Sequence, residues 1–100
     1  MTESKRDGVQ LENGEINYLE LNNVLNAIGT DEYYALGRAA NNNILFANQL
    51  VSRELKKVLK PETIEELKRA GVLNEKNAFP NLRVRVAVST HYNETLDGLR

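Results

Sequence analysis

The amino-acid sequence predicts an α+β fold that is mostly helical, with a long central helix, two shorter helices and a small antiparallel sheet. Three observations predict it. Apolar and polar residues alternate on both sides of Asn13-Gly14, and they alternate again from Leu82 onward, as in strands. Between these regions the apolar residues recur at helical spacing. One hundred residues correspond to one domain, which we place at residues 9–100, after a disordered polar tail at residues 1–8.

The first predicted element is a β-hairpin over residues 9–18, "VQLENGEINY". Asn-Gly between two alternating runs is the strongest short signal for a two-residue type I′ turn. In that register four apolar side chains share one face of the hairpin: Val9, Leu11, Ile16 and Tyr18. Glu12 and Glu15 face each other across the pair, which is unfavourable because like charges repel.

A short helix is predicted next, over residues 19–28. Its apolar residues have helical spacing: Leu21, Val24, Leu25 and Ile28. Gly29 follows directly, at the C′ position where a helix commonly ends with a residue of positive φ. We therefore expect Gly29 to end this helix in that conformation.

The long central helix is predicted to begin near Thr30, a candidate N-cap, and to end before Pro61. Its core stripe follows a 3.6-residue period: Leu36, Ala40, Ile44, Ala47, Val51, Leu55 and Val58. Gly37 and the asparagines at positions 41–43 weaken the helix, so two helices broken near Asn43 are the alternative.

A third helix is predicted over residues 61–73, with proline at its first position and Gly71 at its C′ position. Phe79 is expected to lie under the domain. The alternation from Leu82 predicts a strand over residues 82–90, which would pair with the N-terminal hairpin as a three-stranded sheet. Pairing of this strand with its copy in a second subunit is the alternative.

Composition excludes several classes of chemistry. The chain has no cysteine, which removes disulfides, thiolate nucleophiles and cysteine metal sites. The one histidine, His91, has no nucleophile motif beside it, and the scattered glycines form no phosphate-binding loop. No apolar run is long enough to span a membrane. We therefore expect a cytoplasmic protein that is not an enzyme and has no cofactor or metal.

Residues 44–51 predict a surface for self-association. Around this stretch the apolar side chains point almost all the way round a helix, and a domain of this size has little material to cover every side. A second subunit can cover what remains. The predicted interface residues are Ile44, Leu45, Phe46, Leu50 and Val51.

A ligand site is a further candidate near the C-terminus. Two guanidinium groups, an imidazole and a phenol lie close together in the sequence and can hold an anion or a nucleotide: Arg83, Arg85, His91 and Tyr92. The structural alternative, which we favour, is that charges on an edge strand prevent further pairing.

The charge is uneven along the chain. Residues 1–32 carry a net charge of −5 and residues 33–60 a net charge of +4, although the whole chain is at −1. Four basic residues lie near the end of the predicted central helix: Arg53, Lys56, Lys57 and Lys60. They could bind nucleic acid, but compensation of the helix dipole already explains them, so we do not expect a nucleic-acid partner.

The function predicted from these features is that of a small homo-oligomeric interaction protein that binds or inhibits another macromolecule. Phage and plasmid accessory proteins are examples of this class. A nucleotide-binding or anion-binding oligomer is the first alternative, and nucleic-acid binding through the basic end of the central helix is the second.

Overall fold

The computed structural model describes residues 15–42 and 47–98 of the chain. Five α-helices lie within these residues: α2 (Tyr18–Ala27), α3 (Thr30–Asn42), α4 (Asn48–Val58), α5 (Pro61–Arg69) and α6 (Leu82–Gly98). The same residues form no β-strand, and their one isolated bridge joins Leu73 to Ala78. The predicted α+β class is therefore wrong for the described part of the chain, which is helical.

The segment predicted as a C-terminal strand is helix α6. Asn81 caps its first turn, because the side-chain oxygen accepts a hydrogen bond from the Val84 N–H at 3.0 Å. Val84, Val88 and Tyr92 lie one above another on the buried face. An alternation of period two places apolar residues four apart as well as two apart, so Val84 and Val88 fit both patterns. Leu82, which the strand would have buried, is 64% exposed.

The second arm of the predicted hairpin is also helical. Residues 15–17 belong to no regular element, and Tyr18 begins α2. The side-chain oxygen of Asn17 accepts a hydrogen bond from the Glu20 N–H at 3.1 Å, which caps the helix. Residues 9–14, and the tail predicted at residues 1–8, lie outside the described residues. The predicted sheet therefore has neither its C-terminal strand nor this arm.

The short helix predicted at residues 19–28 is confirmed as α2, but its end differs from the prediction. The backbone becomes extended at Ile28, with φ −76° and ψ 158°. Among the described glycines, positive φ occurs at Gly71 and not at Gly29. The carbonyl of Gly29 instead accepts a hydrogen bond from the Tyr33 N–H at 2.8 Å, so Gly29 belongs to the start of α3.

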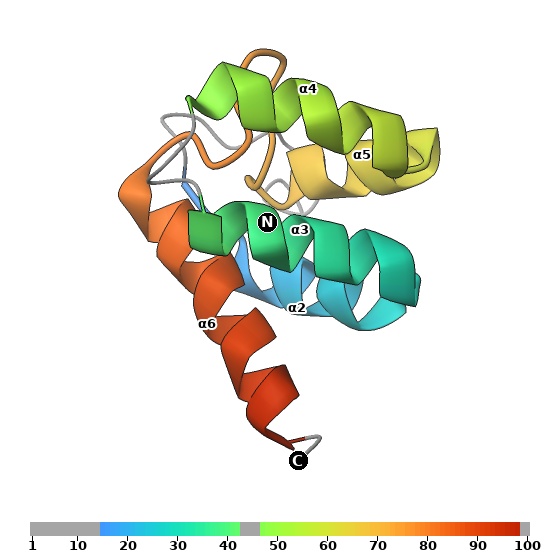
Figure 1. Ribbon diagram of the computed structural model, residues 1–100, viewed down its shortest axis with the longest axis vertical. Helices are drawn as coiled ribbons and strands as arrows, with labels where there is room; N and C mark the ends of the chain where they lie inside the picture. Colours follow the sequence, from blue (N-terminus) through green and yellow to red (C-terminus); the bar gives the residue numbers. More distant parts are fainter. Residues whose placement is uncertain (1–14, 43–46, 99–100) are drawn as a thin grey trace, which may run out of the picture.

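A single long central helix is also wrong, and the alternative of two helices is confirmed. α3 ends at Asn42 and α4 begins at Asn48, after Ala47 in an extended conformation with ψ 143°. The two helices lie side by side and run in opposite directions (Figure 1). Folding back in this way places Leu36, Ala40, Val51 and Leu55 in one core, as predicted. It leaves two other residues of the predicted core stripe at the surface, because Ala47 is exposed and Val58 is 48% exposed.

Helix α5 is confirmed with its predicted start at Pro61 and its predicted C′ glycine, although its last helical residue is Arg69 and it does not extend to residue 73. Proline occupies the first position, and Gly71 has φ 87° just beyond the last turn. The N–H of Val72 donates to the Leu67 carbonyl at 2.9 Å, and the N–H of Gly71 donates to the Lys68 carbonyl at 3.1 Å, which together form a Schellman motif. Phe79 is 1% exposed, in agreement with its prediction, although its φ is 58°.

The start of α5 is held by a residue distant in the sequence. Glu32 of α3 is only 6% exposed, and its carboxylate accepts a hydrogen bond from the Lys60 N–H at 2.6 Å. Lys60 is the N-cap residue of α5 and provides no side-chain cap of its own. An anion at a helix N-terminus is favourable, so Glu32 joins α3 to α5.

The core is closed by the crossing of α3 with α6, the most extensive helix contact in the described fold. Tyr92 lies flat against Gly37, where a side chain would overlap the ring. α6 then continues past the other helices towards the C-terminus (Figure 1). None of the described helices combines the length and apolar character needed to cross a membrane.

Candidate functional site

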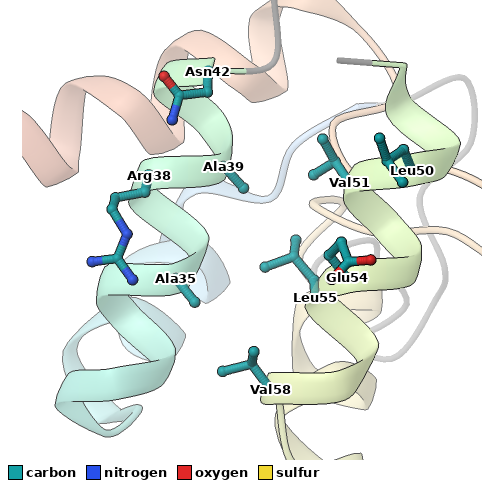
Figure 2. A pocket seen from close by; sticks show the side chains of 9 residues that line it. All are labelled: Ala35, Arg38, Ala39, Asn42, Leu50, Val51, Glu54, Leu55 and Val58. Atoms are coloured by element: carbon teal, nitrogen blue, oxygen red, sulfur yellow. The ribbon is translucent and has the colours of Figure 1, made fainter. Parts of the chain in front are cut away.

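A groove of about 420 Å³ lies between α3 and α4. Figure 2 shows the residues that line it, and we call this surface the α3–α4 groove. They are Ala35, Arg38, Ala39, Asn42, Leu50, Val51, Glu54, Leu55 and Val58. Most of this lining is apolar, although it is open to solvent.

The floor and the edge of the groove differ in burial. Val51 and Leu55 are 6% and 3% exposed and belong to the core, whereas Leu50 and Val58 are 40% and 48% exposed. The apolar stripe of α4 is therefore wider than the surface that α3 covers. Leu50 and Val58 lie two helical turns apart along the same exposed edge, with Glu54 between them.

Two opposite charges flank the groove. Arg38 lies on α3 and Glu54 on α4, at a similar level along the groove (Figure 2). The carboxylate of Glu54 also lies 3.3 Å from Lys57 Nζ, in a pair whose side chains are about 60% exposed. Such an exposed pair contributes little to stability, so the Glu54 carboxylate can accept a second cation.

A second groove, of about 510 Å³, lies between α2 and α6 and is called the α2–α6 groove. Its lining combines apolar residues with a few polar ones: Tyr18, Leu21, Asn22, Leu82, Arg83, Val86, Ala87, Thr90, His91 and Glu94. Tyr18, Leu82 and Val86 are 52%, 64% and 45% exposed. This surface therefore also presents apolar side chains to solvent.

The structure brings together two of the four predicted ligand residues. Arg83 and His91 lie on one face of α6 and both line the α2–α6 groove. Arg85 points elsewhere, and its guanidinium donates to the Ala40 carbonyl at 3.3 Å. Tyr92 is 6% exposed and packs in the core. The four residues therefore do not form one site.

His91 also belongs to a polar and aromatic cluster between α3 and α6. Tyr33 Oη lies 2.8 Å from His91 Nδ1 and donates to Thr95 Oγ1 at 2.9 Å. The rings of Tyr33 and Tyr92 are 5.6 Å apart, and those of Tyr34 and Tyr92 are 6.0 Å apart. Burial raises the pKa of the Tyr33 phenol, and the hydrogen bond to Thr95 partly opposes that rise.

The structure describes part of the predicted interface. Leu50 is at the exposed edge of the α3–α4 groove, and Val51 is in its floor. Residues 44–46, the other predicted interface positions, lie outside the described residues. The basic residues predicted at the end of the central helix are exposed on α4 or directly after it: Arg53, Lys56, Lys57 and Lys60.

Sequence patterns alone had missed Arg38, Glu54 and Val58 as residues of this surface. Leu50, Glu54 and Val58 recur every fourth residue, which was the available signal for a second exposed edge on α4. Arg38 had no local signal, because its place depends on how α3 packs against α4. Within residues 15–42 and 47–98, no group of three or more acidic or histidine side chains could hold a metal ion.

Comparisons with protein-family models, with curated proteins and with solved structures gave no match to this chain.

Proposed function

We propose that the protein is a cytoplasmic, non-enzymatic interaction protein that holds an apolar helix in its α3–α4 groove. The observation that supports this function is the exposure of Leu50 and Val58 beside a buried apolar floor. Contiguous exposed apolar surface of this kind is typical of interaction sites. A groove between two antiparallel helices fits the mode in which a partner's amphipathic helix contributes a row of apolar anchors.

The length of the groove sets the size of the bound segment. Leu50 and Val58 are separated by eight residues of α4, or about 12 Å at 1.5 Å per residue. That distance matches slightly more than two turns of a bound helix. We therefore expect anchors spaced three or four residues apart, with at least two of them in contact with the groove.

The energy available from this contact is moderate. Leu50 and Val58 are already half buried, so covering each one adds about 1 kcal/mol, roughly half the value of a fully buried side chain. Replacing either residue by serine should therefore weaken binding about five- to tenfold. The fold should tolerate the change because neither side chain is in the core.

Selection from a displayed library of helical peptides tests this function. We expect selected peptides to carry apolar residues on one face and to bind Leu50→Ser and Val58→Ser more weakly than wild type, as measured by calorimetry. Val86→Ser is the matched control, because Val86 is 45% exposed but lies in the α2–α6 groove. If no helical peptide binds, or if all three variants bind equally well, the proposed function is wrong.

Binding of a small anion in the α2–α6 groove is a second candidate. It is supported by the presence of Arg83 and His91 in one groove beside the ring of Tyr18, since guanidinium groups hold phosphate and aromatic rings stack on bases. Titration of a nucleotide panel by calorimetry tests it. Arg83→Ser should abolish the heat of binding, whereas Arg85→Ser should not. Absence of heat from wild type removes this candidate.

A further inference from the structure

We infer that the α3–α4 groove is covered by α3 and α4 of a second copy of this chain, in a two-fold dimer that pairs Arg38 of each copy with Glu54 of the other. This inference rests on the proposed function, because it names the occupant of the same groove. The inference adds a defined two-fold axis and two ion pairs whose charges can be reversed by substitution.

The charges select one orientation of the second copy. Arg38 and Glu54 lie at a similar level on opposite sides of the groove (Figure 2). A two-fold axis running along the groove places α4 of one copy on α3 of the other, so each Arg38 faces a Glu54. An axis across the groove would instead place α3 on α3, with one Arg38 near the other. Attraction therefore favours the first arrangement, and repulsion opposes the second.

The shapes of the two helices agree with that axis. The side of α3 that faces the groove carries the small residues Ala35 and Ala39, which let another helix approach closely. The side chains that project from α4 beside the groove are the larger Leu50 and Val58. Packing α4 of each copy on α3 of the other sets large apolar side chains against small ones at two symmetric places. A self-complementary contact of this kind is what a two-fold dimer requires.

Charge reversal tests the pairing by analytical ultracentrifugation across a range of micromolar concentrations. Wild type should sediment as a dimer. Arg38→Glu and Glu54→Arg should each weaken dimerisation by roughly tenfold or more, because each creates two like-charge contacts per dimer. An equimolar mixture of the two single variants should dimerise again, because each contact then joins opposite charges. The double variant Arg38→Glu/Glu54→Arg should also dimerise, because it again places opposite charges at both contacts.

Arg53→Glu is the matched control, since Arg53 is an exposed arginine of α4 outside the groove lining. This variant should dimerise like wild type. A peptide selected for the groove should dissociate the dimer by competition. If wild type stays monomeric but binds such peptides, the dimer is wrong and the proposed function stands. If wild type dimerises without response to either charge reversal, the Arg38–Glu54 pairing is wrong. If neither a dimer nor peptide binding is found, both proposals fail.

Discussion

Replacement of Gly37 by alanine tests the packing of α3 on α6 with a single methyl group. An alanine Cβ at this buried position would lie 2.6 Å from Tyr92 Cε1 and closer still to two other atoms of the ring. Carbon atoms pack favourably at about 3.5–4.0 Å, so the overlap is strongly repulsive. Either the helices move apart or the Tyr92 ring leaves its site.

The loss in the free energy of unfolding caused by Gly37→Ala follows from the contacts that Tyr92 makes. Exposing Tyr92, which is 6% exposed, loses about 2 kcal/mol of apolar burial. Its contacts with the rings of Tyr33 and Tyr34 are worth about 1 kcal/mol more. Alanine gains about 1 kcal/mol over glycine inside a helix. The net loss is therefore about 2 kcal/mol, or roughly 10 °C in Tm for a domain of this size.

Urea denaturation followed by circular dichroism at a fixed protein concentration measures this loss. Gly98→Ala is the matched control, because a Cβ at Gly98 meets nothing within 4 Å and should leave stability unchanged or slightly higher. In a Tyr92→Ala background, Gly37→Ala should become stabilising by up to about 1 kcal/mol, because the ring that opposes it is gone. If Gly37→Ala stabilises the wild-type protein, the close contact of α3 with α6 is refuted.

Three further predictions concern individual side chains. Glu32→Ala should lower the free energy of unfolding by about 2 kcal/mol because the Lys60 N–H loses its buried partner, and Glu32→Gln should lower it less; urea denaturation compares them. Burial raises the pKa of the Tyr33 phenol. The contribution of this raised pKa to the free energy of unfolding is therefore complete below the unfolded pKa of about 10, and it is lost as the pH rises through the folded pKa. In urea titrations at alkaline pH, Tyr33→Phe should therefore lose less stability with rising pH than the wild-type protein does. An equal loss in the two proteins would contradict the raised pKa of Tyr33. Asn81→Ala should cost about 1 kcal/mol in thermal unfolding by removing the cap of α6, and an unchanged Tm would contradict that role.

The helix whose end signals the sequence predicted correctly, α5, has ends set by local chemistry. Helix α5 begins at Pro61 because proline suits the first helical position, and it ends at Arg69, two residues before Gly71, because glycine accepts the positive φ of the C′ position. Both signals act within a few residues of the helix. Such ends can be predicted without knowledge of the tertiary fold.

Helix α6 could not be predicted in that way. Its valines favour strands, and their positions satisfy both the two-residue and the four-residue period. The cap at Asn81 and the burial of Val84, Val88 and Tyr92 against α3 decide in favour of the helix. Packing between elements distant in the sequence overrides the local preference, and this packing is not visible in the spacing alone.

The residues of the candidate sites also depend on how elements distant in the sequence pack together. On a strand, Arg83 and Arg85 share a face; on a helix they are roughly 200° apart, and Arg83 instead shares a face with His91. Leu50 could be predicted as part of an exposed apolar surface from the apolar character of its own helix. Arg38 could not, because its position beside Glu54 depends on the pairing of α3 with α4.

The most direct test of the central claim is a methyl NMR titration of the protein with a helical peptide selected for binding. The claim is that the exposed apolar edge of the α3–α4 groove is the contact surface. It predicts that the methyl signals of Ala35, Leu50 and Val58 shift, whereas those of Leu82 and Val86 in the α2–α6 groove do not. Shifts confined to Leu82 and Val86, with Leu50 and Val58 unchanged, would contradict it.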